Sequence, residues 1–246
     1  MPPSSLDLVV PCYNPSAGWA VQMTQNMQKL QTLLSGIDLH LILVNDGSSR
    51  GVQPSDIQHL QKHLPSFTYL SYEVNQGKGF ALRTGVAHST SPLCLYTDID
   101  FPYEETSMAR VYQTLAHGNV DIAIGIRDAD YYAQVPPSRT KISKLLKRLT
   151  RNFLRLPIND TQCGLKGFNQ KGRQLFLETQ INRYLFDLEF IYLASKLAQE
   201  VVMVPIEVAL KPEIVFSKMN FKILLQESYS FLKIFFTSSS QRFKSK

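Results

Sequence analysis

The chain alternates between two hydrophobic patterns. Short apolar runs rich in β-branched residues are typical of strands, whereas apolar positions spaced by three and four are typical of helices. Strands are predicted at residues 6–11, 39–45, 67–74, 92–97 and 120–126, with helices at 19–35, 54–64, 78–89 and 104–117. This alternation predicts an α/β, Rossmann-like fold, in which helices sandwich a mostly parallel sheet.

After residue 126 the pattern changes character. Residues 139–156 place apolar side chains at helical spacing and carry basic residues but no acid. Such a helix is typical of an element that faces a membrane surface or phosphate groups, although an ordinary exposed face also fits. Residues 183–199 predict a further helix, and residues 201–205 a short strand.

The C-terminal part is again amphipathic. Residues 217–236 place apolar side chains on one helical face, which fits either packing on the domain or lying at a bilayer interface. The chain is therefore divided into a catalytic-type domain at residues 1–211 and a C-terminal amphipathic helix with a basic tail at 212–246.

Composition narrows the class of protein. The 246 residues are 44% hydrophobic, which is enough for one sizeable core, and the net charge of +6 indicates basic patches suited to phosphorylated ligands or anionic membranes. No nucleic-acid partner is expected.

Cys12, Cys94 and Cys163 lack metal-ligand spacing, so reduced thiols in a cytoplasmic protein are expected. Neither a signal peptide nor a spanning helix is predicted.

Polar residues follow each of the first four predicted strands. In open sheets of this type, ligands gather at the carboxyl ends of the strands. The four clusters occupy residues 11–14, 45–49, 75–79 and 98–100. Together they predict one binding site at that edge.

Asp98 and Asp100 end the fourth strand one residue apart. On an extended backbone, residues spaced by two share a face, so both carboxylates can converge on one ion. Mg²⁺ or Mn²⁺ commonly binds one or two carboxylates together with substrate phosphate oxygens. The alternative is a pair of strand-end acids that cap the helix beginning near Glu104.

The third cluster is a candidate diphosphate site. Gly77 and Gly79 let the backbone approach a ligand, while Lys78 and Arg83 bring positive charge to a helix start whose amides favour anions. The loop at 45–49 could grip a base or ribose, or be a plain turn. A nucleotidyltransferase would carry a glycine-rich loop directly after the first strand, and that loop is missing.

A second group of polar residues lies between 159 and 168. Asp160, Gln162 and Lys166 could orient a donor sugar and an acceptor, whereas the alternative is an edge strand with a bulge at Gly164. Asp187 falls in the first turn of a predicted helix, where it is either a dipole partner or cap, or catalytic.

Taken in order, these motifs resemble the family 2 glycosyltransferases, and most of all their dolichyl-phosphate and polyprenyl-phosphate glucosyl- and mannosyltransferase branch. The resemblance covers residues 6–205. Its motifs are Val10-Pro11-Cys12-Tyr13-Asn14, Asn45-Asp46-Gly47-Ser48-Ser49, residues 75–83, Asp98-Ile99-Asp100, and Asp160-Thr161-Gln162-Cys163-Gly164-Leu165-Lys166.

The resemblance implies a GT-A fold and a metal-dependent, inverting transfer of a hexose from a nucleotide diphosphate sugar of the UDP-glucose or GDP-mannose type. It implies Mg²⁺ or Mn²⁺ on Asp98 and Asp100, and an Asp46 carboxylate that accepts from a base N–H. The implied donor-binding residues are Pro11, Tyr13, Asn14, Asp46, Gly77, Lys78, Arg83 and Asp98. Arg127, Arg139 and Ser143 would face phosphate. The implied catalytic residues are Asp100, Arg127, Asp160, Gln162, Lys166 and Asp187.

The sequence departs from the family pattern at two positions. Pro15 stands where a Glu is usual, and Asn45 replaces the first Asp of the common Asp-Asp-Gly-Ser. Many relatives also carry membrane-spanning helices after the catalytic domain, whereas this chain is expected to contact the cytoplasmic face of a membrane peripherally.

The acceptor is left open between two chemistries. A lipid phosphate is already an anion and needs positioning by arginines, whereas a saccharide hydroxyl needs a carboxylate base, for which Asp160, Asp187 and Glu189 are candidates. A third possibility is a nucleotide-sugar-binding module without catalysis, prompted by Pro15 and Asn45.

Overall fold

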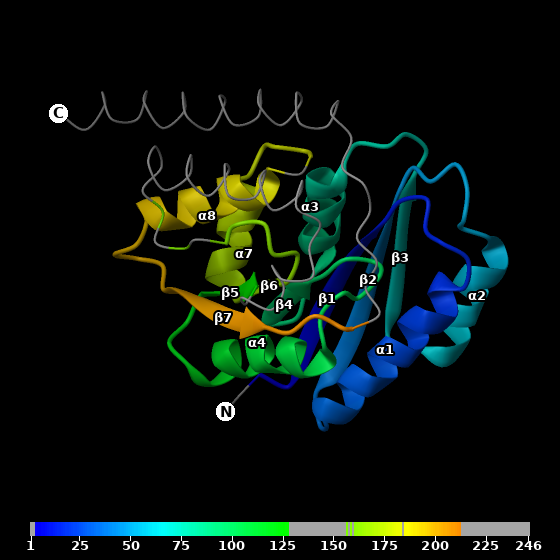
Figure 1. Ribbon diagram of the computed structural model, residues 1–246, viewed down its shortest axis with the longest axis horizontal. Helices are drawn as coiled ribbons and strands as arrows, with labels where there is room; N and C mark the ends of the chain where they lie inside the picture. The colour runs from blue at the N-terminus through cyan, green and yellow to red at the C-terminus, as the bar shows by residue number, and fades with distance from the viewer. Residues whose placement is uncertain (1–2, 128–155, 157, 159, 184, 213–246) are drawn as a thin grey trace.

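The computed structural model describes residues 3–127, 156, 158, 160–183 and 185–212 (Figure 1). The first half contains β1 (Ser5–Cys12), α1 (Trp19–Leu33), β2 (Asp38–Asp46), α2 (Pro54–His63), β3 (Phe67–Tyr72), α3 (Lys78–His88), β4 (Leu93–Tyr96) and α4 (Glu105–His117). The second half contains β5 (Ile122–Arg127), β6 (Lys166–Phe168), α7 (Gln170–Leu177), α8 (Phe186–Lys196) and β7 (Met203–Val208).

The strands form one seven-stranded sheet in the order β3-β2-β1-β4-β6-β5-β7. All neighbouring pairs are parallel except the two that involve β6, which runs antiparallel between β4 and β5. The predicted mostly parallel sheet is therefore confirmed. The edge-strand alternative for residues 159–168 is wrong, because β6 is central and begins after Gly164.

Side chains alternate between the two faces of the sheet, as the strand period requires. On β1, Leu8 and Val10 belong to a core that includes residues of α1, α2 and α4, whereas Val9 belongs to a second core with residues of α3, α7 and α8. Figure 1 shows these two groups of helices on opposite sides of the sheet. Each fully buried aliphatic side chain stabilises this layering by about 1.5–3 kcal/mol.

The predicted elements agree with the structure except for β6 and α7, which the hydrophobic pattern does not reveal. A strand of three residues is too short to show a period of two, and α7 is only a two-turn helix. The predicted helices at 139–156 and 217–236, and with them the proposed division of the chain at residue 212, lie outside the described residues.

The three cysteines are free and buried, as expected. Burial raises the pKa of the Cys12 and Cys94 thiols to about 12 and that of Cys163 to about 11, so all three stay protonated near neutral pH. Within the described ranges, the helices are too short or too polar to cross a bilayer.

The fold brings the predicted polar clusters to one edge of the sheet. The carboxyl ends of β1, β2, β4 and β5 meet there, and Lys166 at the start of β6 lies opposite Tyr96 at the end of β4. Because β6 is antiparallel, the loop that precedes it lies at the same edge. The 160–165 loop therefore joins the site.

Candidate active site

The two predicted metal-binding acids lie just beyond β4. The amide of Phe101 donates to the carbonyl of Asp98 over 3.0 Å, and Phe101 adopts a φ of +45°. Asp98 and Asp100 therefore occupy a tight turn and not the extended strand that was predicted. A positive φ at a bulky residue is strained, and such strain is concentrated at functional sites.

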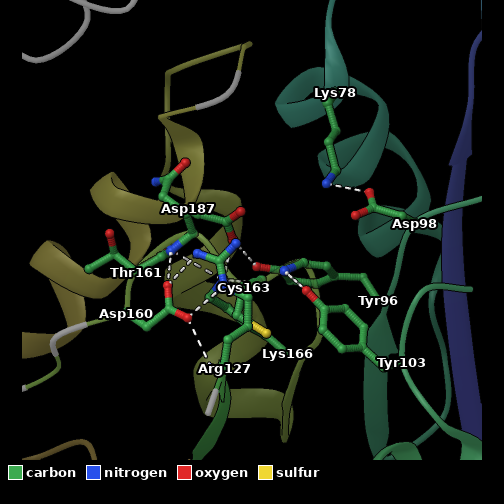
Figure 2. Close-up of polar contacts among 12 residues, drawn as sticks. Lys78, Tyr96, Asp98, Tyr103, Arg127, Asp160, Thr161, Cys163, Lys166 and Asp187 are labelled. Carbon is green, nitrogen blue, oxygen red and sulfur yellow. Dashed lines mark hydrogen bonds and ion pairs between the residues drawn. The ribbon is translucent and has the colours of Figure 1, made fainter. Parts of the chain in front are cut away.

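Asp98 forms an ion pair with Lys78, the first residue of α3 (Figure 2). Burial opposes the positive charge of Lys78, but the carboxylates of Asp98, Asp187 and Asp100 raise its pKa overall. The ammonium therefore stays charged at neutral pH. Both partners remain partly exposed, so a ligand can reach them.

Asp100 is exposed to solvent, and its predicted role as a metal ligand stays a prediction. The pKa of Asp100 is raised, mainly because the surrounding protein displaces part of the water around its carboxylate, and also because Asp98 is negatively charged. Two crowded carboxylates fit a hard divalent ion, which would relieve their repulsion. Residues 3–127 and the later described segments hold no cluster of three or more acids, histidines or cysteines suited to a metal.

The N-terminus of α3 does not offer the free amides that were predicted for a diphosphate. The amides of Gly79 and Phe80 donate to the backbone carbonyl of Asn182, over 2.8 and 3.3 Å. The amide of Gly77 donates to Asp46 over 3.0 Å, and a Cβ at Gly77 would lie 2.5 Å from the Asn182 oxygen. Of this motif, the Lys78 ammonium is the group that faces the acids.

Asp46 organises the loop that leads into α3. Its buried carboxylate accepts from the Tyr72 hydroxyl at 2.7 Å, the Asn75 side-chain amide at 2.8 Å, and the backbone amides of Gln76 and Gly77 at 2.7 and 3.0 Å. The predicted hydrogen bond from a nucleotide base to Asp46 stays a prediction, and that base would have to compete with these four donors for the carboxylate.

Asn14 ties the β1 loop to the β2 loop. Its side-chain oxygen accepts from the amides of Ser49 and Arg50 at 3.0 and 3.1 Å, and its own amide donates to Ser48 Oγ at 2.9 Å. Tyr13 beside it is 51% exposed, as a residue that stacks on a nucleoside must be. Pro11 is instead buried within β1.

Arg83 is half-buried, and its guanidinium is hydrogen-bonded to the protein. Its guanidinium donates to Thr179 Oγ1 at 3.3 Å, to the Ile181 carbonyl at 2.9 Å, and to the side chain of Asn182. Arg83 therefore fixes the loop between α7 and α8, whose Asn182 carbonyl caps α3. A direct nucleotide contact by Arg83 stays a prediction.

Arg127, at the end of β5, holds Asp160. The carboxylate accepts from Nε at 2.7 Å, from a terminal guanidinium nitrogen at 2.6 Å, and from the Arg127 backbone amide at 3.0 Å. Such a bidentate pair is strong and geometrically defined. The predicted site residues Arg127 and Asp160 are thus brought together, whereas Arg139 and Ser143 lie outside the described residues.

Lys166 and Asp187 form a buried ion pair beneath the site (Figure 2). The Lys166 ammonium, which is 0% exposed, donates to Asp187 at 2.6 Å and to the Cys163 carbonyl at 2.6 Å. Burial and then Asp187 raise the pKa of Tyr96, so its hydroxyl keeps the proton that it donates to Asp187 at 2.5 Å. Through its contact with the Cys163 carbonyl, the pair positions the 160–165 loop, and the catalytic roles of Lys166 and Asp187 stay predictions. Asp187 is not a helix cap.

The 160–165 loop rests directly on the acid turn. The Gly164 amide donates to the Tyr103 hydroxyl at 2.9 Å, and a Cβ at Gly164 would lie 2.4 Å from an Asp98 carboxylate oxygen. In this loop, the side-chain nitrogen of Gln162 is buried and has no hydrogen-bond partner. A buried unpaired donor is costly unless a ligand satisfies it, which fits the predicted role of Gln162, and that role stays a prediction.

Two tyrosines of the site were not predicted. Tyr96 lies in an apolar run, where it resembles an ordinary core residue, and Tyr103 follows the acids without a recognisable motif. The sequence offers one signal that could have found such partners, namely Lys166, a charged residue two positions before the apolar Phe168. A lysine in a central strand needs buried polar partners.

Comparison with known proteins is consistent with this geometry. The model of the family "Glycosyl transferase family 2" matches residues 7–175. The chain is 27% identical to a dolichyl-phosphate beta-glucosyltransferase of Trichomonas vaginalis over 93% of its own length and 72% of the relative's. It is 26% identical to the human dolichyl-phosphate beta-glucosyltransferase, over 79% of its own length and 64% of the human protein's. The chain thus spans about two thirds of these relatives.

Solved structures share the fold at low sequence identity. Mannosyl-3-phosphoglycerate synthase from Rubrobacter xylanophilus aligns with a TM-score of 0.71 at 15% identity, covering 98% of this chain and 76% of that one. Glucosyl-3-phosphoglycerate synthase from Mycobacterium tuberculosis was solved with Mn²⁺, UDP-glucose and phosphoglyceric acid. It aligns with a TM-score of 0.58 at 14% identity, covering 86% of this chain and 73% of that one.

Proposed function

Because the chain belongs to the family 2 glycosyltransferases and has their GT-A fold, we propose that it transfers a hexose, with inversion, from a nucleotide diphosphate sugar to a dolichyl or polyprenyl phosphate. The names of the similar proteins, dolichyl-phosphate beta-glucosyltransferases, support both the acceptor and glucose as the sugar.

On the donor side, Asp98 and Asp100 would hold Mg²⁺ or Mn²⁺ against the diphosphate. When bound, the ion would neutralise charge on the departing nucleotide. Lys78 adds a fixed positive charge at the same place, since its ammonium already contacts Asp98. In the 160–165 loop, the side-chain nitrogen of Gln162 is a buried donor without a hydrogen-bond partner, which supports a contact to the donor sugar. The exposure of Tyr13 at the neighbouring strand end supports a contact to the nucleoside.

A lipid phosphate is favoured as the acceptor because all three candidate bases are already engaged by donors within the protein. Asp160 is held by Arg127, Asp187 by Lys166 and Tyr96, and the Glu189 carboxylate accepts from the amides of Gln180 and Ile181 at 2.9 and 2.8 Å. A carboxylate that is engaged by donors in this way is not free to approach an acceptor hydroxyl and take its proton. An acceptor that is already anionic, such as a lipid phosphate, needs no such base.

The experiment is a transfer assay with the full chain. Radiolabelled UDP-glucose or GDP-mannose is incubated with Mg²⁺ or Mn²⁺ and dolichyl phosphate, and the organic-phase product is counted. Glucose transfer is expected, and Asp100→Asn should lower it about 100-fold or more, because a main charge-stabilising group is lost. Asp38→Asn, at the exposed opposite end of β2, is the control.

The same assay separates the alternatives. Transfer to saccharide hydroxyls but not to dolichyl phosphate would replace the acceptor and keep the enzyme class. Donor binding without transfer or hydrolysis in any acceptor screen would instead support a binding module. Full activity in Asp100→Asn would remove the metal role assigned to the acid turn.

We also propose peripheral contact with the cytoplasmic face of a membrane. The support is the purely basic pattern of residues 139–156 and the amphipathic pattern beyond Pro212, both outside the described residues. Flotation with liposomes containing anionic lipid tests this. The full chain should float, and a chain ending at residue 212 should float less.

A further inference from the structure

Lys211 lies directly after the last described strand, far along the chain from the acid turn, yet it is buried against that turn. Its side chain is 10% exposed, and its ammonium donates to Glu105 on α4 at 2.7 Å and to Asn26 on α1 at 3.0 Å. A buried lysine is costly unless it is paired, so this position is specified by its partners.

The backbone around Lys211 is paired with the residues that follow Asp100. The Lys211 amide donates to the Pro102 carbonyl at 2.9 Å, and the Glu104 amide donates to the Ala209 carbonyl at 3.0 Å. Between them, Tyr103 and Leu210 form an antiparallel bridge. Residues 209–211 thus add a short strand-like strap to the segment 102–104.

The strap covers the strained residue of the turn. Phe101 has a φ of +45° and is fully buried, and the Lys211 ammonium lies 5.9 Å from the centre of its ring. A non-glycine residue in this conformation is strained and persists only where the surroundings impose it. The strap and the Lys211 side chain are such surroundings.

We propose that Lys211 is a positioning residue for Asp100. By joining α1, α4 and the ring of Phe101 through one ammonium, it holds the turn in the conformation that presents the Asp100 carboxylate to a divalent cation. This inference rests on the proposed function, since it assumes that Asp100 binds the ion. Lys211 itself does not touch the ion or the substrate.

The test measures ion binding and not turnover. Mn²⁺ is titrated calorimetrically into the full chain with saturating UDP, and in separate runs with GDP. Lys211→Met keeps the aliphatic stem on Phe101 but removes the charge, and it should weaken Mn²⁺ binding roughly tenfold, as loss of residues behind metal ligands does. Lys29→Met, an exposed lysine on α1, is the matched control and should bind as wild type.

Lys211→Met leaves Glu105 buried without its cation, so a second variant guards against misfolding. Lys211→Met combined with Glu105→Gln leaves no unpaired charge and should show the same tenfold loss with a cooperative melting transition. A lower melting temperature with unchanged Mn²⁺ affinity in either variant would overturn the positioning role.

Asp100→Asn, titrated in parallel, separates the two proposals. If Asp100→Asn loses Mn²⁺ binding while the Lys211 variants keep it, only the role of Lys211 fails. If Asp100→Asn binds Mn²⁺ like the wild type, the metal assignment on which the inference rests fails.

Discussion

The two halves of the site edge hold their carboxylates in different ways. At the end of β2, Asp46 is surrounded by neutral donors, namely one hydroxyl, one side-chain amide and two backbone amides. Around β4, β6 and β5, Asp98, Asp160 and Asp187 are each paired with a lysine or arginine. The first half is a hydrogen-bonded scaffold, and the second is a set of ion pairs.

The three ion pairs differ in how deeply their side chains are buried, and this difference suggests different roles. The side chains of Lys78 and Asp98 are 23% and 33% exposed, those of Arg127 and Asp160 are 13% and 5%, and those of Lys166 and Asp187 are 0% and 5%. An exposed pair can exchange partners with a charged ligand, whereas a buried pair cannot without large cost. We therefore expect ligand contact at the outer pair and loop positioning at the inner one.

The largest effect is expected at the innermost pair. Lys166→Met should lower the free energy of unfolding by about 3–5 kcal/mol, because Asp187 is left as a buried charge without its cation. Urea denaturation measures the loss. Adding Asp187→Asn removes the leftover charge while keeping an acceptor for Tyr96, and it should restore most of the stability. A loss in Lys166→Met no greater than that of an exposed lysine, such as Lys62→Met, would contradict a buried pair.

A smaller loss is expected in the scaffold of neutral donors. Asp46→Asn turns one acceptor oxygen into an NH₂ group that faces N–H donors, which should cost about 1–3 kcal/mol of stability through unsatisfied groups. The change is read by urea denaturation against Asp38→Asn. A loss at Asp46 equal to that of Lys166→Met would erase the contrast between the two halves.

Gly164→Ala probes the contact between the 160–165 loop and the outer pair. The added methyl group would meet an Asp98 oxygen at 2.4 Å, so the carboxylate must move, and transfer activity should fall about tenfold or more. Gly118→Ala is a matched control, because its Cβ would lie 2.9 Å from the Thr114 carbonyl at the end of α4. If both variants lose activity equally, the loss comes from general crowding and not from Asp98.

The smallest effect is expected from a hydrogen-bonded carboxylate outside the site. Burial raises the pKa of Asp7, but hydrogen bonds from His40, Ser89 and Ser91 outweigh it and hold the pKa far below its ordinary 3.8. The depressed pKa stabilises the fold above pH 3.8, and this contribution is lost as the pH falls toward the folded-state pKa. Between pH 5 and pH 3 the wild type should lose about 1 kcal/mol that Asp7→Asn does not lose.

Urea midpoints of both proteins at several pH values in that range test this expectation. The gap in stability between wild type and Asp7→Asn should narrow as the pH falls. Parallel curves for the two proteins would show that Asp7 is not an ionised hydrogen-bond acceptor in the folded state.

The sequence by itself determined the layers, the order along the chain of the strands other than β6, and the edge that carries the site. These follow from short-range patterns, since a period of two or 3.6 fixes which face each residue buries, and strand ends in a parallel sheet meet at one edge. The acid pair at Asp98 and Asp100 was visible for the same reason, because it directly follows an apolar run.

Only the tertiary structure decided which groups face a ligand and which face the protein. Asn182 covers the amides of α3, Lys166 turns inward to Asp187, and Lys211 returns to the turn after Asp100. Each of these pairings joins residues far apart in sequence, and each depends on the insertion of β6 or on the packing of a loop. Local patterns contain no information about such partners, because they are set by the register of the whole sheet and by the requirement that buried charges be paired.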